Sequence, residues 1–360
     1  MAKKFSLVSL FSGCGGFDLG LSKAGFKTLF ATDFEEDCCY SLEKNKVADL
    51  ILHAPIEEIS KAKIKKTIVT KPGELDLLAG GPPCPAYSKS RFYRKDKPHG
   101  MDDPSSHTLF DYFKFVEVLK PKIFIMENVP GLMYKRQKGA FQAVLDCARK
   151  LKYEINYSVL NAVEYGVPQI RERLFIIGTR KGYNFNFPEP SHRKKELDES
   201  NDSMPLFESN LKKPITAGQA IEDLDTEENA SDEGHKAGGK HQDLLKQVPP
   251  GDNYLFFTEK RGHPNPQFEW RSRYWSFLLK LSPTKPSWTI QAKRSNNMGP
   301  FHWRNRILRI EEIKRLQTFP DRFHLVGKTE SQWRQIGNAV PPVLSRCLGN
   351  KIIECIENGK

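Results

Sequence analysis

The hydrophobic pattern of residues 1–180 alternates short apolar or β-branched runs with longer amphipathic ones. The short runs predict strands, and the longer runs predict helices. Strands are expected at residues 5–10, 27–32, 75–79, 123–127, 157–161 and 174–179. Helices are expected at residues 17–24, 36–45, 109–119 and 140–150. This alternation predicts an α/β fold, a doubly wound and mostly parallel sheet with helices on both faces.

The pattern changes after Arg180. Residues 181–260 are rich in Ser, Asn, Pro and Gly with little periodicity, and aromatic residues then alternate with basic ones up to residue 300. Further helices are expected at residues 311–317 and 342–353. We therefore predict a first domain at 1–188, a smaller one at 189–300, and a segment at 301–360 that completes the second domain and returns a C-terminal helix to the first.

The charge of the chain is uneven. It has 360 residues and a net charge of +12, but residues 181–260 hold 10 basic and 16 acidic side chains, and residues 261–300 hold 7 basic and 1 acidic. The basic regions suggest a polyanionic partner, with the acidic cluster at 222–233 facing away from it. No apolar run is long enough to span a bilayer, and no signal peptide is evident, so we expect a cytoplasmic protein with no membrane partner. Seven cysteines without a CxxC pair argue against a disulfide framework or a metal site.

Ligands of such sheets bind in the loops after the strands. The first loop, FSGCGGFDLG (residues 11–20), is glycine-rich and lets a ligand approach the backbone, but its spacing matches neither the dinucleotide fingerprint nor a P-loop. A purely structural turn is the alternative. The second loop begins with Asp33 and Phe34, a carboxylate for ribose hydroxyls and a ring to stack on a base. A helix-capping Asp followed by a core Phe is the alternative there.

The remaining loops carry groups that can do chemistry. Cys84 lies in GGPPCPAYS (residues 80–88), where the prolines favour an exposed nucleophile over a buried, inert thiol. Glu127 ends an apolar strand, where burial can raise its pKa and make it an acid, although a solvated carboxylate is the alternative. Arg171 and Arg173 are two residues apart and are expected to point to one face. There they could bind a phosphate or a ring carbonyl together. Two unrelated surface arginines are the alternative.

Taken in order, these segments resemble the DNA (cytosine-5)-methyltransferase family, most closely its bacterial restriction-modification type. The resemblance covers about residues 5–180 and 283–345. It rests on FSGCGGFDLG, GGPPCPAYS, ENV, QIRER, RILRIEEIKRLQTFPD and QIGNAVPP. It implies an S-adenosylmethionine-dependent methyltransferase fold at residues 1–188 and a target-recognition domain at 189–300.

The resemblance also implies roles for residues. The thiolate of Cys84 would add to carbon 6 of a flipped-out cytosine, Glu127 would act on ring nitrogen 3, and Arg171 and Arg173 would hold the base carbonyl. S-adenosyl-L-methionine would contact Phe11, Ser12, Gly13, Gly15, Phe17, Asp33, Phe34, Leu109 and Asn338. The chain departs from the family where an Asp usually meets the adenine, because Pro55 stands there, and that contact stays open.

Duplex DNA is the partner that the resemblance implies. We expect a monomer, but the sequence leaves the oligomeric state open. The residues expected to contact DNA are Ser88, Gln169, Arg271, Arg273 and Arg294. Whether a restriction endonuclease acts on the same site stays open. A tRNA methyltransferase on the same scaffold and a DNA-binding regulator without activity are the competing hypotheses. The chain lacks the Cys-Phe-Thr signature of the tRNA methyltransferases. The intact Cys84, Glu127 and Arg171 argue against a regulator without activity.

Overall fold

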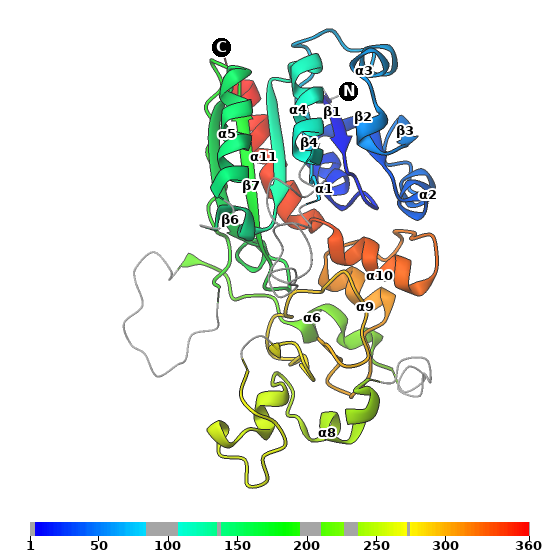
Figure 1. The fold of residues 1–360 in the computed structure, drawn as a ribbon, viewed down its shortest axis with the longest axis vertical. Helices are drawn as coiled ribbons and strands as arrows, with labels where there is room; N and C mark the ends of the chain where they lie inside the picture. The colour runs from blue at the N-terminus through cyan, green and yellow to red at the C-terminus, as the bar shows by residue number, and fades with distance from the viewer. Residues whose placement is uncertain are drawn as a thin grey trace.

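A mixed β-sheet forms the upper part of the protein as drawn in Figure 1. The computed structural model describes residues 4–83, 107–134, 138–194, 210–226, 237–271 and 274–359. Within these ranges, seven strands form one sheet in the order β3-β2-β1-β4-β5-β7-β6. The strands are β1 (Phe5–Leu10), β2 (Phe26–Asp33), β3 (Leu50–His53), β4 (Leu77–Gly80), β5 (Ile123–Asn128), β6 (Glu154–Asn161) and β7 (Glu172–Thr179). Pairing is parallel from β3 to β5 and antiparallel on both sides of β7, so the prediction of a mostly parallel sheet is confirmed.

Helices cover both faces of this sheet (Figure 1). The main helices of the described residues are α1 (Gly16–Ala24), α2 (Glu36–Lys44), α3 (Lys61–Thr67), α4 (His107–Leu119), α5 (Lys138–Lys150), α6 (Ala217–Ile221), α8 (Gln242–Gln247), α9 (Ile310–Leu316), α10 (Thr329–Asn338) and α11 (Pro342–Asn358). Phe124 and Met126 of β5 join the core beneath α3, α4 and α5, whereas Ile123 and Ile125 join the core beneath α1 and α11. Strand side chains alternate between faces, so a strand buried on both sides is continuously apolar.

The C-terminal helix α11 packs closely against α1. A Cβ atom added at Gly20 would lie 2.3 Å from the carbonyl oxygen of Pro342, so only glycine permits this approach. The hydroxyl of Ser345 donates to the carbonyl of Phe17 at 2.5 Å, which fixes the register of the two helices. This packing brings the residues just before α11 to the loop after β1.

The lower part of the protein has a separate hydrophobic core built on α6, α8, α9 and α10. A buried ion pair strengthens it, because both terminal nitrogens of Arg306 donate to Glu312, at 2.6 and 2.8 Å. Cys14, from the loop after β1, belongs to this core, so the two parts of the protein are in contact. The domain boundaries at residues 188 and 300 stay predictions.

Five of these elements were not expected from the pattern: β3, α3, α6, α8 and α10. Strand β3 has four residues and lies at the sheet edge with half-exposed or exposed side chains, so it has no apolar signature. Helices α3 and α10 are mostly polar: the buried hydrophobic side chains are Ile64 in α3 and Trp333 and Ile336 in α10. No helix in the described ranges is long and apolar enough to cross a membrane.

Candidate active site

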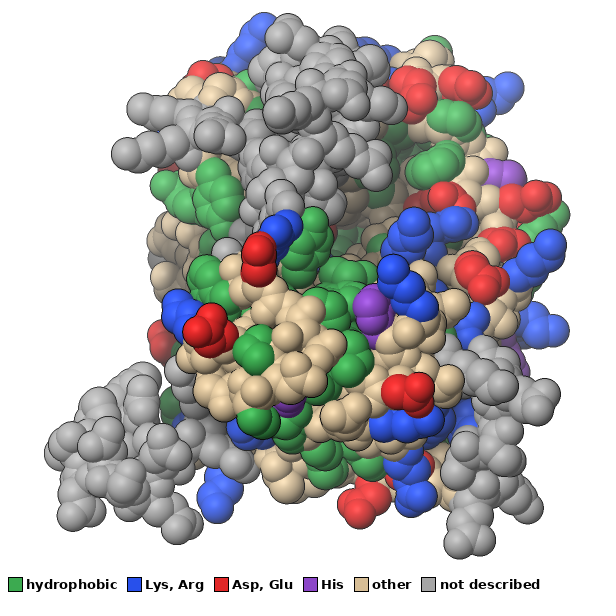
Figure 2. Space-filling model, turned by 60° about the horizontal axis from the view of Figure 1, so that its bottom comes forward, with side chains coloured by type: hydrophobic (Ala, Val, Ile, Leu, Met, Phe, Trp, Pro, Cys, Tyr) green, Lys and Arg blue, Asp and Glu red, His purple; other side chains and the backbone are tan. Residues whose placement is uncertain are grey.

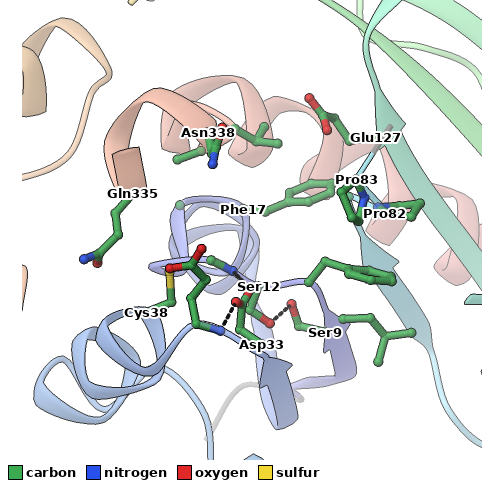
Figure 3. A pocket seen from close by; sticks show the side chains of 18 of the residues that line it. Ser9, Ser12, Phe17, Asp33, Cys38, Pro82, Pro83, Glu127, Gln335 and Asn338 are labelled. Atoms are coloured by element: carbon green, nitrogen blue, oxygen red, sulfur yellow. Dashed lines mark hydrogen bonds between the residues drawn. The ribbon is translucent and has the colours of Figure 1, made fainter. Parts of the chain in front are cut away.

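A cavity of about 400 Å³ opens at the carboxyl edge of the sheet. It lies where the strand order reverses, because β2 and β4 flank β1 and the chain winds in opposite directions from there. Ligands of doubly wound sheets bind at this point. The loops after β1, β2, β4 and β5 line the cavity together with α10 and the residues that follow it (Figure 3). These are the four loops in which the sequence places its candidate groups.

One wall of the cavity is the glycine-rich loop and the end of β2. Gly13 has φ +54° and Gly15 has φ +90°, left-handed values that favour glycine. The N–H of Gly13 donates to Oδ2 of Asp33 at 2.8 Å, and the N–H of Glu35 donates to Oδ1 at 3.0 Å. Burial raises the pKa of Asp33, and these two donors oppose that shift. Phe34, next to Asp33, is 58% exposed. A carboxylate with free lone pairs and an exposed aromatic ring therefore lie side by side.

The opposite wall carries an acid and an arginine. Nε of Arg173 lies 2.9 Å from Oε1 of Glu127. Burial raises the pKa of Glu127, while the charges of Arg173 and Arg171 lower it. The neighbouring Asn128 donates from Nδ2 to the carbonyl of Pro82 at 3.2 Å and thereby ties β5 to the loop after β4. Glu127 thus lies in a mostly buried site beside two arginines, which suits acid chemistry.

Gly81 leaves room for this acid. A Cβ atom at residue 81 would lie 3.1 Å from Oε2 of Glu127, which Arg173 holds in place. Glu127 is the acid that the resemblance implies, so we expect Gly81→Ala to lower kcat about tenfold by displacing its carboxyl group slightly. The melting temperature should hardly change. Gly139→Ala on α5 is the control, since a Cβ there meets no atom within 4 Å. Unchanged kcat in Gly81→Ala would contradict this close fit.

The comparison with known proteins decides the family. The profile described as C-5 cytosine-specific DNA methylase matches residues 5–354. The chain belongs to this family. It is a DNA (cytosine-5)-methyltransferase, as the sequence predicted.

Relatives of known type support the assignment. The type II methyltransferase M.SacI of Streptomyces achromogenes is 36% identical, with 98% of this chain and 94% of the relative covered. M.NgoFVII of Neisseria gonorrhoeae is 35% identical, with 95% and 84% covered. Among solved structures, Entamoeba histolytica methyltransferase EhMeth has a TM-score of 0.59 at 16% identity, with 98% of this chain and 99% of that chain covered. That similarity shows the fold alone.

The methyltransferase gathers most of its predicted catalytic and cofactor-binding residues around one cavity. Those that line it are Phe11, Ser12, Gly13, Phe17, Asp33, Phe34, Glu127, Arg173 and Asn338. Gly15 and Leu109 are outside the lining: Gly15 caps α1, and Leu109 is buried in the core beneath α4. Cys84, Ser88 and Arg273 lie outside the described residues. Pro82 and Pro83, directly before Cys84, do line the cavity.

The side chains of two expected site residues do not face the cavity. Arg171 is fully buried, and its terminal nitrogens donate to the carbonyls of Ile290, Gly337 and Ala339 rather than facing the cavity. Gln169 is also fully buried. Its amide donates to Gln317, and its carbonyl accepts from the N–H of Ile290. Neither side chain is placed to contact a base or DNA in this arrangement. Both instead join the segment before β7 to the lower part of the methyltransferase.

Two acidic residues at the start of the 222–233 cluster form ion pairs: Asp223 pairs with Arg315, and Asp225 pairs with Arg304. Members of the cluster thus neutralise basic residues of the C-terminal segment. That the cluster faces away from DNA stays a prediction. Of the residues expected to bind DNA, Arg271 is exposed beside Glu269, and Arg294 is mostly buried beside Glu330.

Sequence reasoning missed residues that shape the cavity. Glu35, Cys38, Arg334 and Gln335 line it, and Asn128 both lines it and holds Pro82. Asn128 and Gln335 had a signal, because Asn128 directly follows Glu127 in the ENV motif and Gln335 begins the QIGNAVPP motif. Glu35, Cys38 and Arg334 had none, since α2 and α10 meet only in the folded chain.

Proposed function

We propose that the chain transfers a methyl group from S-adenosyl-L-methionine to carbon 5 of a flipped-out cytosine, in a specific duplex sequence, as the modification enzyme of a restriction-modification system. The observation that carries this proposal is the cavity itself. It brings together the carboxylate of Asp33, the exposed ring of Phe34, the carboxyl group of Glu127 and the start of the Cys84 loop.

The residues of the cavity fit the cofactor. Asp33 keeps lone pairs free for the ribose hydroxyls, because each carboxylate oxygen accepts one backbone N–H, from Gly13 or Glu35, and has further lone pairs. Phe34 offers its exposed ring to the adenine, and the backbone of Gly13 is open toward the cavity. When bound, S-adenosylmethionine supplies an electrophilic methyl group. The loop from Phe11 to Phe17 would orient its methionine end.

The described cysteines are unreactive, which supports Cys84 as the nucleophile. Burial raises the pKa of every one of them, so each stays a protonated thiol at neutral pH. These are Cys14, Cys38, Cys39, Cys147, Cys347 and Cys355. The thiol of Cys84 lies outside the described residues, after two prolines that line the cavity.

Chemistry at the base then follows from the residues. The Cys84 thiolate forms a bond to carbon 6, and the ring electrons move to carbon 5. Glu127 donates a proton or hydrogen bond to nitrogen 3, which makes carbon 6 more electrophilic. Arg173 holds Glu127 and lies close enough to share in binding the base carbonyl. After carbon 5 takes the methyl group, loss of its proton restores the double bond and expels Cys84. Arg171 would act as a positioning residue through the backbone carbonyls that it binds.

DNA would bind through the lower part of the protein. Trp270, Tyr274 and Trp275 are exposed there, and Nζ of Lys260 lies 4.2 Å from the ring centre of Trp270. Figure 2 shows hydrophobic side chains exposed among Lys and Arg on this face. Aromatic and basic groups together suit base edges and phosphates. We further propose a cytoplasmic monomer that acts on nucleoid DNA, with a restriction endonuclease for the same site as its partner.

Bisulfite sequencing tests the function directly. DNA from cells that express the protein should retain unconverted cytosines in one short sequence context, and only there. Methyl incorporation from labelled S-adenosylmethionine into duplex DNA should exceed incorporation into tRNA by at least about a hundredfold. Cells that express a Cys84→Ala variant are the control. Uniform conversion, or methylation of tRNA instead, would refute the proposed substrate.

A further inference from the structure

Two opposite charges meet across the cavity. Glu35 follows β2 directly before α2, and Arg334 lies on α10 in the C-terminal part of the chain. Nη2 of Arg334 lies 2.5 Å from Oε2 of Glu35, and both residues line the cavity. The side chain of Arg334 is 45% exposed and that of Glu35 is 31% exposed, whereas lining residues such as Ser12, Phe17 and Gln335 are buried. We propose that Glu35 and Arg334 form a side-chain gate at the mouth of the cofactor cavity.

The helices that carry this pair are held together by other bonds. Ser41 of α2 donates to the side-chain carbonyl of Gln335 at 2.7 Å and accepts from the N–H of Val326 at 2.9 Å. Asn45 and the backbone of His324 exchange two hydrogen bonds. Gln335 of α10 and Cys38 of α2 both line the cavity (Figure 3). Because α2 and α10 are fixed below the pair, passage past it requires movement of the two side chains and not of the helices.

The position of the gate indicates which ligand it controls. Glu35 is two residues after Asp33, and its N–H binds that carboxylate, so the gate adjoins the proposed ribose position. Arg334 is one turn before Asn338, on the other wall. A molecule entering toward Asp33 from the side of α2 and α10 must pass between them. The inference therefore rests on the proposed function, since the ligand that passes is the cofactor or its product.

A gate has a kinetic signature. An exposed ion pair is weak, so the closed form exceeds the open form by about twofold to fivefold. If bound ligand leaves the pair intact, removing the pair speeds entry and exit by the same factor and leaves the dissociation constant unchanged. A residue that contacts the ligand directly has a different signature, because its loss speeds exit alone and weakens binding.

Stopped-flow fluorescence with S-adenosylhomocysteine separates these cases. We expect Arg334→Gln and Glu35→Gln to raise both the association and dissociation rate constants about twofold to fivefold, with Kd changed less than about twofold. The charge-swapped double variant, Glu35→Arg with Arg334→Glu, should restore the slower rates. Lys27→Gln is the matched control, because Lys27 of β2 forms an exposed ion pair with Asp49, and neither residue lines the cavity.

Each outcome decides the matter. Unchanged rates in both single variants would overturn the gate, and so would faster dissociation with a proportional loss of affinity. Failure of the swapped variant to restore slow exchange would overturn the role of the pair. If the unaltered protein did not bind S-adenosylhomocysteine at all, the proposed cofactor would be refuted first. Binding with unaltered kinetics in the variants would refute only the gate.

Discussion

Replacing Cys84 with Ser is expected to lower methyl transfer by more than about a thousandfold, because the hydroxyl is a far weaker nucleophile than a thiolate and nothing else takes its place. The six described cysteines cannot substitute, since burial raises the pKa of each. Binding of S-adenosylhomocysteine should be unchanged, because Asp33 and Phe34 are on the other wall of the cavity. Single-turnover methyl incorporation and ligand titration measure the two effects separately.

A covalent trap identifies the nucleophile independently. Duplex DNA with 5-fluorocytosine at the target position should form a stable adduct, because fluorine cannot leave as the proton does. Peptide mapping should find the base on Cys84. The control is the Cys84→Ser variant, which should give no adduct. Attachment to any other residue, or full turnover by the variant, would contradict the proposed mechanism.

The sequence predicts the sheet and one half of the site well, for a physical reason. Strands such as β1 and β5 are buried on both faces, and their apolar runs are unmistakable. The loops that follow them must meet at one edge, so Asp33 and Glu127 line the same cavity. Strand β3 gave no such signal, because it lies at the edge and exposes Leu50.

The arginine motif shows where sequence spacing fails. Arg171 and Arg173 are two residues apart, so strand alternation would place both on one face. However, β7 begins at Glu172, and Arg171 precedes it. Only Arg173 reaches Glu127, while Arg171 turns to the carbonyls of Ile290 and Gly337. These partners are more than 100 residues away along the chain, and no local sequence pattern predicts them. The same holds for the gate, whose two charges are 299 positions apart.

Glu127→Gln is expected to lower kcat by about a hundredfold or more, the usual contribution of a general acid. Glutamine keeps the shape and can still donate an N–H, but it cannot hold or release a proton at nitrogen 3. Fold and cofactor binding should survive, since Asn128, not Glu127, holds the backbone of Pro82. Glu172→Gln is a matched control, as Glu172 is an exposed neighbour of Arg173 that pairs with Lys194.

The pH profile makes this prediction specific. Burial raises the pKa of Glu127 above its ordinary value, and Arg173 only partly opposes the shift. The acid form is therefore retained to a higher pH than in a solvated glutamate, and the reaction needs that form. Activity should fall as pH rises through the pKa of Glu127. This decline should be absent from the residual activity of Glu127→Gln and present in Glu172→Gln. The same decline in all three proteins would mean that another group titrates, and Glu127 would then act only by shape and hydrogen bonding.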